Sequence, residues 1–174
     1  MKIILVDGYN VIYASPSLKI LLSRSLYKAQ DKLIEMVCRH CSLQNIRGYV
    51  VFDAYRRDGE ERVQEVSPLV KVVYTAGGKT ADSFIERFIA KNKSRYTYIY
   101  VITSDLAQGM TVLDDKIIPV SPKSFLNEVK ISLDFINKRY SPQANPFVSH
   151  LISGDTLREI LKKKTVKNRK RKPG

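Results

Sequence analysis

The sequence predicts an α/β domain of three layers, in which helices cover both faces of a mostly parallel sheet of five strands. Two observations lead to this prediction. Short apolar runs recur at five places along the 174 residues, and most are continuous rather than alternating, as expected for strands buried on both faces. Between several of them lie segments with the three- and four-residue spacing of amphipathic helices, which is the order of βαβ units with right-handed crossovers.

The five predicted strands differ in the strength of their signal. The runs at 2–6 (KIILV) and 98–103 (YIYVIT) are almost continuously apolar. Weaker runs lie at 49–52 (YVVF), 70–74 (VKVVY) and 116–120 (KIIPV). Because their hydrophobicity does not alternate, we expect these strands to lie in the interior of a parallel sheet.

Three helices are predicted from apolar residues that recur every three or four positions. They cover residues 25–43, 81–91 and 123–138, and Thr80 is a candidate N-cap of the second. The charged segment at 54–68 has no clear period and predicts a loop or a broken helix.

The chain is predicted to divide near residue 140. Residues 1–140 form the α/β domain, and 141–174 form a linker, a short capped helix and a disordered basic tail. The linker is indicated by two prolines in SPQANPF, and the helix by SGDTLREILKKK.

The formal net charge of +13 is unevenly placed along the chain. Residues 162–172 (KKKTVKNRKRK) hold eight lysines and arginines and no acid, so the remaining residues carry +5. Such a tail gains affinity for phosphates by releasing counterions, which favours nucleic acid as a partner over a merely solubilising role. An anionic membrane surface is a weaker alternative, because no apolar face accompanies the charge. The residues expected to contact RNA are Lys162, Lys163, Lys164, Lys167, Arg169, Lys170, Arg171 and Lys172 in the tail.

The chain begins directly with a strand-like run and contains no apolar segment near the length of about 20 residues that spans a bilayer. We therefore expect an intracellular, cytoplasmic protein without a targeting peptide. Cys38 and Cys41 form a single C-x-x-C in a helical pattern, without a second pair of ligands. Helix packing is the preferred interpretation of these cysteines, and a zinc site the alternative.

Acidic residues recur where the predicted strands end. Asp7, Asp53 and Asp105 each come directly or almost directly after a strand, and Asp82 falls in the first turn of the helix that follows 70–74. Glu86 lies one helical turn beyond Asp82 and shares its face. Because ligands of open α/β sheets bind outside the carboxyl ends of the strands, we expect these carboxylates to converge.

Each acid also has an ordinary structural interpretation. An aspartate after a strand is a common turn residue, and one in the first turn of a helix complements the helix dipole. A cluster of like charges in an otherwise basic protein, however, normally needs a cation. Oxygen ligands of this kind select Mg²⁺ or Mn²⁺, and such a site in a basic protein indicates phosphodiester chemistry.

Smaller residues fit the same site. Asn10 could orient Asp7 or a water molecule, or act as a helix N-cap, and Ser104 could bond a phosphate or cap the next element. Gly8 would allow close backbone approach, and Lys79 could contact a phosphate. The segment AGGKT at 76–80 lacks the spacing of a P-loop, so nucleotide binding by that route is excluded.

Two other α/β classes fit less well. A receiver domain would require a pair of adjacent acids after the first strand, but Asp7 stands between Val6 and Gly8. Lys123 is only a partial match to the lysine of that class, and Asp82 and Asp105 would have no role. A haloacid-dehalogenase-like phosphatase requires D-x-D, but position 9 is a tyrosine.

Four motifs together resemble the YacP-like NYN-domain proteins of the PIN-like nuclease superfamily. They are ILVDGYNVI at 4–12, VVFDAY at 50–55, KTADSFIE at 79–86 and VITSD at 101–105, and the resemblance covers roughly residues 1–140. It implies a PIN-like α/β/α fold, metal-dependent endoribonuclease activity and, for bacterial members, work on mRNA in association with the ribosome.

By motif, the resemblance implies that Asp7, Asp82 and Asp105 are the catalytic acids that bind the metal. It makes Asn10 and Asp53 supporting positions, and Glu86 a further candidate. The resulting hypothesis is Mg²⁺- or Mn²⁺-dependent cleavage of single-stranded RNA. The alternative is a non-catalytic module that binds RNA or the ribosome with the same fold.

Overall fold

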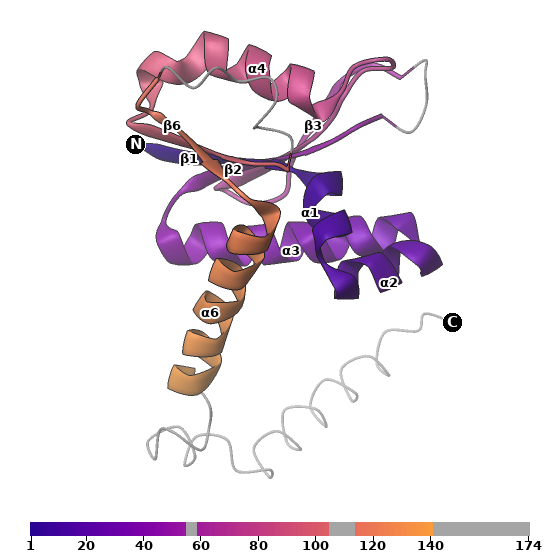
Figure 1. Cartoon of the computed structure of the whole chain (residues 1–174), viewed down its shortest axis with the longest axis vertical. Helices are drawn as coiled ribbons and strands as arrows, with labels where there is room; N and C mark the ends of the chain where they lie inside the picture. Colours follow the sequence, from indigo (N-terminus) through magenta and orange to yellow (C-terminus); the bar gives the residue numbers. More distant parts are fainter. Residues whose placement is uncertain (55–58, 105–113, 141–174) are drawn as a thin grey trace, which may run out of the picture. The chain divides into compact units, whose positions relative to one another are not determined.

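The computed structural model describes residues 1–54, 59–104 and 114–140, and in them one mixed sheet is flanked by helices (Figure 1). The strands are β1 (Lys2–Asp7), β2 (Arg47–Phe52), β3 (Arg62–Glu65), β4 (Val70–Tyr74), β5 (Tyr98–Ile102) and β6 (Ile117–Val120). The helices are α1 (Gly8–Ala14), α2 (Pro16–Arg24), α3 (Leu26–Gln44), α4 (Ala81–Asn92), the 3₁₀ turn η1 (Lys93–Arg95) and α6 (Pro122–Tyr140). The sheet and the start of α6 belong to one compact unit, Met1–Leu133.

The sheet has the order β3-β4-β2-β1-β5-β6, with β1 near its centre. β1 pairs in parallel with β2 on one side and with β5 on the other, and β4 and β6 extend the parallel part outward. All five predicted strands are therefore confirmed within a residue or two.

A sixth strand, β3, lies in the charged segment that the sequence predicts as a loop or broken helix, so that prediction was wrong. β3 pairs antiparallel with β4 at the edge of the sheet, and all four of its residues are exposed. An edge strand with both faces in water needs no apolar pattern, because backbone hydrogen bonds to its neighbour define it. The sheet is accordingly mixed rather than wholly parallel.

The three predicted helices are confirmed as α3, α4 and α6, but α1 and α2 were not predicted. Each of the first three helices begins at a polar cap whose side chain accepts a backbone N–H: Asp7 for α1, Ser15 for α2 and Ser25 for α3. Pro16 occupies the first turn of α2, where its missing N–H costs nothing. The cap residues are visible in the sequence, but α1 and α2, with seven and nine residues, are too short for a strong periodic pattern.

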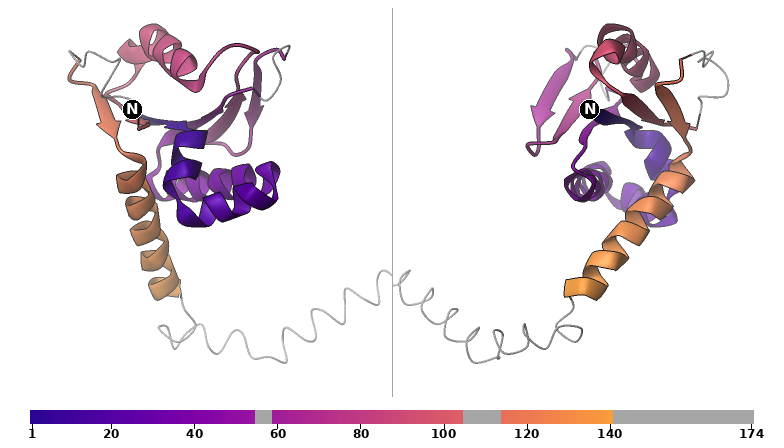
Figure 2. Two further views of the ribbon diagram at one scale, coloured as in Figure 1. Left: turned by 45° about the vertical axis from the view of Figure 1, so that its right-hand side comes forward. Right: turned by 90° about the vertical axis from the view of Figure 1, so that its left-hand side faces the viewer.

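Two separate cores explain why the strands are continuously apolar. In β1, Ile4 and Val6 pack in a core with residues of α1, α2, α3 and α6, whereas Ile3 and Leu5 pack in the core beneath α4. Figures 1 and 2 show α4 on one face of the sheet and α1–α3 on the other. The predicted three-layer α/β/α arrangement is therefore confirmed.

The carboxyl ends of β1, β2, β4 and β5 meet at one edge of the sheet, because these strands are parallel. The chain adds β2 and β4 on one side of β1, and then crosses over to place β5 and β6 on the other. The switch point therefore lies beside the end of β1, where open α/β sheets bind their ligands.

The two cysteines of the C-x-x-C lie on α3 and are free thiols. Cys41 is fully buried, and a Cβ atom on Gly48 would meet its Sγ at 2.8 Å, so the helix packs tightly on β2 here. Among the described residues no group of three or more His, Cys, Asp or Glu side chains is arranged to hold a metal ion. Cys41 thus serves helix packing.

The predicted linker, short helix and basic tail at 141–174 lie outside the described residues, so the boundary near residue 140 stays a prediction. None of the described helices is both long enough and apolar enough to cross a membrane.

Candidate active site

Asp7 is a buried residue at the end of the central strand, only 7% exposed. It also caps α1: its Oδ1 accepts the backbone N–H of Asn10 at 3.0 Å, and its Oδ2 accepts the Asn10 side-chain amide at 2.8 Å. Both carboxylate oxygens are therefore oriented by one residue of the next helix.

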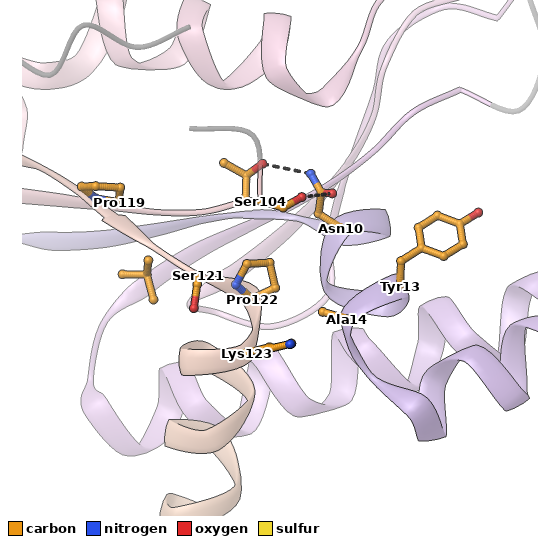
Figure 3. Close-up of a pocket in the computed structure, with 10 residues that line it drawn as sticks. Asn10, Tyr13, Ala14, Ser104, Pro119, Ser121, Pro122 and Lys123 are labelled. Carbon is orange, nitrogen blue, oxygen red and sulfur yellow. Dashed lines mark hydrogen bonds between the residues drawn. The ribbon is translucent and has the colours of Figure 1, made fainter. Parts of the chain in front are cut away.

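Asn10 joins the ends of β1 and β5. Besides its bond to Asp7, its Nδ2 donates to Thr103 Oγ1 at 2.9 Å, and its Oδ1 accepts the hydroxyl of Ser104 at 2.6 Å. Figure 3 shows these bonds between Asn10 and the residues that follow β5. Because Thr103 and Ser104 follow a strand that pairs with β1, the asparagine fixes Asp7 relative to the switch point.

Asp53, the first residue after β2, is tied to the beginning of α4. Its Oδ1 accepts the backbone N–H of Ala81 at 2.5 Å, while Thr80 and Ser83 form a capping box at the same helix end. Asp82, the next residue of α4, is exposed in the first turn, where the helix dipole favours a carboxylate. The hydrogen bond that Asp53 accepts from Ala81 thus places Asp82 at the same edge of the sheet.

Thr75, directly after β4, links the same loops and is almost fully buried. Its Oγ1 accepts the N–H of Ala54 at 3.0 Å and donates to the carbonyl of Lys79 at 2.7 Å. The segments that follow β2 and β4 are therefore connected beneath the start of α4. The sequence offered only a single threonine after a strand, which by itself does not distinguish this role.

The charges of the three carboxylates act on one another. Burial is the main cause that raises the pKa of Asp7 from its usual value of 3.8 to about 6. The negative charges of Asp82 and Asp53 raise it further, and the hydrogen bonds from Asn10 oppose the change. The structure therefore brings Asp7, Asp53 and Asp82 into one electrostatic site, as their positions after strands predict.

Of the other predicted site residues, the structure describes Glu86 and Lys79. Glu86 is exposed one turn further along α4 and makes no hydrogen bond or ion pair with any described residue. Lys79 is exposed in the loop before α4. Asp105 and the basic residues of 162–172 lie outside the described residues.

Two neighbours of Asp7 serve mainly packing. A Cβ atom on Gly8 would lie 2.2 Å from Cε1 of Phe52, so the close approach at this glycine is made by an aromatic ring. The ring of Tyr9 meets the same Phe52 edge-on with centroids 5.4 Å apart, and its hydroxyl accepts from Gln30 at 3.2 Å. Tyr9 is thus a half-buried packing residue.

The donor set suits a hard divalent cation. Carboxylate, hydroxyl and amide oxygens are the ligands that Mg²⁺ and Mn²⁺ prefer. A cation would offset the burial of the Asp7 charge, which is the main cause of its raised pKa, and also the smaller repulsion from Asp82 and Asp53. Within the described residues, however, the carboxylates do not form a ready group of three ligands. The oxygens at this edge fit such an ion in kind, and Asp7, Asp53 and Asp82 are the described carboxylates whose charges interact there.

A cavity of about 500 Å³ adjoins this edge, between α1, the residues after β5, and the junction of β6 with α6. Sequence reasoning did not identify its residues Tyr13, Pro119, Ser121 and Lys123 as a group. No signal in the sequence brings them together, because the cavity depends on how α6 packs against the sheet.

Comparisons with known proteins identify the family of this chain. The family model of the YacP-like NYN domain matches residues 4–170. The chain is 36% identical over 130 residues to the uncharacterized protein YacP of Bacillus subtilis (strain 168). The aligned residues make up 75% of this chain and 76% of that protein.

Two solved structures are also similar. The crystal structure of Rae1 (YacP) from Bacillus subtilis matches with a TM-score of 0.71 and 31% identity, over 95% of each chain. A mutant of Rae1 matches with a TM-score of 0.66 and 33% identity, over 80% of this chain and 81% of the other.

Proposed function

Because the chain belongs to the YacP-like NYN domain family, a nuclease-like and PIN-related family, we propose that it is a metal-dependent endoribonuclease acting on single-stranded RNA. The observation that supports this most directly is the buried Asp7 at the switch point of the sheet, in the field of Asp53 and Asp82. An acid whose pKa is raised by burial, and further by neighbouring carboxylates, is typical of a functional site.

Asp7 and Asp82 would hold the metal, with Asp53 and Glu86 as further oxygen donors at the same edge and Asp105 as the predicted acid after β5. When bound, Mg²⁺ or Mn²⁺ would activate a water molecule, orient the scissile phosphate and stabilise the leaving oxygen.

The residues of the chain contribute orientation and charge. Asn10 holds both oxygens of Asp7, so the carboxylate keeps one direction without the cost of ordering it during the reaction. Asp53 receives a backbone bond from α4 and thereby positions Asp82. Above about pH 6 the Asp7 carboxylate is ionised and competent to bind a cation.

RNA is the proposed substrate because the protein is strongly basic as a whole and also carries an acidic site. A net charge of +13 attracts a polyanion, and the lysines and arginines of 162–172 would bind its phosphates without sequence preference. Following the family resemblance, we further propose mRNA in association with the ribosome as the natural setting, in the cytoplasm.

The competing proposal is a non-catalytic module that binds RNA or the ribosome with the same fold. The decisive experiment follows the cleavage of a labelled single-stranded RNA with Mn²⁺ or Mg²⁺. Asp7→Asn and Asp82→Asn are expected to abolish cleavage while RNA binding persists. Asp115→Asn is the matched control, since this exposed aspartate precedes β6 at the opposite edge of the sheet. If the wild-type protein binds RNA but cleaves it with neither metal, on or off ribosomes, the non-catalytic proposal holds.

A further inference from the structure

The cavity beside the acidic site has the size of a ligand pocket. Its volume of about 500 Å³ falls within the range of about 300–1,000 Å³ that is usual for small-molecule and cofactor sites. Figure 3 shows its walls: α1 with Asn10, Tyr13 and Ala14 on one side, and on the other Ser121 after β6 with Pro122 and Lys123 of the first turn of α6.

The cavity and the acidic site share part of their walls. Asn10, Thr103 and Ser104 line the cavity, and the same Asn10 holds the carboxylate of Asp7. Because the two sites share Asn10, an RNA strand with one phosphate at Asp7 can place the neighbouring nucleotide in the cavity.

The charge of the cavity is opposite to that of the acidic site. No acid lines it among the described residues, and its one cationic side chain, Lys123, forms no ion pair within the described part of the chain. In Figure 3 the Lys123 side chain extends from the first turn of α6 towards α1. The carboxylates favour a cation, whereas the cavity next to them favours an anion.

The beginning of α6 adds to this preference. Ser121 caps the helix, its Oγ accepting the N–H of Ser124 at 3.1 Å, and Pro122 follows it. The positive end of the helix dipole therefore lies at the cavity wall that also bears Lys123.

Tyr13 provides an aromatic surface at the same cavity. Its side chain is 56% exposed on α1, and its ring lies beside that of Tyr9 with centroids 6.4 Å apart. Figure 3 shows the ring projecting outward from α1 next to Asn10. An exposed ring supported on one side by a second aromatic is suited to stacking a base.

From these observations we infer that the cavity is a subsite for the nucleotide that adjoins the cleaved phosphate of a single-stranded RNA. Lys123 and the start of α6 contact the phosphate of that nucleotide, and Tyr13 stacks on its base. This inference rests on the proposed function for its substrate, but it concerns binding and is tested without cleavage.

The first test measures binding of a short fluorescent single-stranded RNA by anisotropy in EDTA, where the proposed cleavage cannot occur. Lys123→Gln is expected to weaken binding and to reduce the slope of log K against log salt by about 0.7, the value for one phosphate of a single strand. Lys130→Gln is the matched control, because it removes the same charge from an exposed position two turns along α6. Equal slopes for the wild type and Lys123→Gln would overturn the phosphate contact.

The second test compares two substitutions of the tyrosine. Tyr13→Ala is expected to weaken binding by about 5- to 150-fold, the range for loss of one stacked base, and Tyr13→Phe to retain it. Tyr98→Ala removes a partly exposed tyrosine at the opposite edge of the sheet and should bind as the wild type does. Thermal unfolding verifies that each variant folds. If Tyr13→Ala binds as tightly as Tyr13→Phe, the stacking role is refuted.

The outcomes separate this inference from the proposed function. Cleavage by the wild type together with unchanged binding of both Lys123→Gln and Tyr13→Ala would overturn the subsite and leave the endoribonuclease standing. Weakened binding of these variants, with no cleavage by the wild type under Mg²⁺ or Mn²⁺, would support the cavity as a nucleotide-binding site and overturn the enzyme.

Discussion

Replacing Asp7 by asparagine is expected to stabilise the metal-free protein while abolishing its proposed activity. Folding raises the pKa of this carboxyl from 3.8 to about 6, mainly because the group is buried, so ionisation of Asp7 opposes folding. Each pKa unit corresponds to about 1.4 kcal/mol, so the cost is about 3 kcal/mol at a pH well above 6.

The sign follows from proton binding. Between pH 3.8 and about 6 the folded protein holds more protons at Asp7 than the unfolded chain does, so stability falls as pH rises through this window. The two pKa values give a cost of about 1 kcal/mol near pH 4.5 and about 3 kcal/mol near pH 7.5. An asparagine carries no charge at either pH and avoids this cost.

The hydrogen bonds around position 7 can adapt to the amide. Asparagine is as good an N-cap as aspartate, so its oxygen can still accept the backbone N–H of Asn10. The Asn10 side chain can turn over, because the hydroxyls of Thr103 and Ser104 can each reverse from acceptor to donor or the opposite. We therefore expect Asp7→Asn to gain between about 1 and 3 kcal/mol near neutral pH.

Urea unfolding in EDTA, at about pH 4.5 and about pH 7.5, measures this gain. The advantage of Asp7→Asn over the wild type should be larger by about 2 kcal/mol at the higher pH. Adding Mn²⁺ at the higher pH should stabilise the wild type and leave the variant unchanged. If the variant is no more stable than the wild type, or if its advantage is equal at both pH values, ionisation of Asp7 does not oppose folding as inferred.

Three further predictions concern the surroundings of the site. Asn10→Ala should lower the free energy of unfolding in urea by about 1–3 kcal/mol, because it removes the side-chain donor to Asp7. A smaller loss would show that the hydrogen bonds of Asn10 do not stabilise the fold. Gly8→Ala should cost about 1–3 kcal/mol through the clash with Phe52, and adding Phe52→Leu should recover part of it; no recovery would place the strain elsewhere. Deleting 162–172 should flatten the salt dependence of RNA binding by several units of slope, whereas an unchanged slope would exclude the tail as the main source of affinity.

The central strands were predictable because burial on both faces leaves a continuous apolar run that needs no knowledge of neighbours. β3 was not predictable in this way, since all four of its residues are exposed and only pairing with β4 makes them a strand. The helices α1 and α2 were not predicted for a different reason. Their caps at Asp7 and Ser15 are local signals, but their length gives too few turns for periodicity to be recognised.

The acids at one edge were predictable once the strands were assigned, because parallel strands end together. The structure places Asp7, Asp53 and Asp82 at that edge. The hydrogen bond from Asn10 to Thr103 could not be predicted from the sequence, because the two residues are 93 positions apart and meet only through the pairing of β1 with β5. The cavity with Lys123 depends in the same way on tertiary packing.

The hydrogen bond between Asp53 and Ala81 joins residues 28 positions apart in the sequence. It fixes the beginning of α4 to the end of β2 directly, whatever path the chain takes between them. During divergence, the connection that includes β3 can therefore change in length without displacing Asp82. Loss of the carboxylate at position 53 would remove this hydrogen bond. We therefore expect Asp53 to be retained among relatives in which the sequence and length of the connection change.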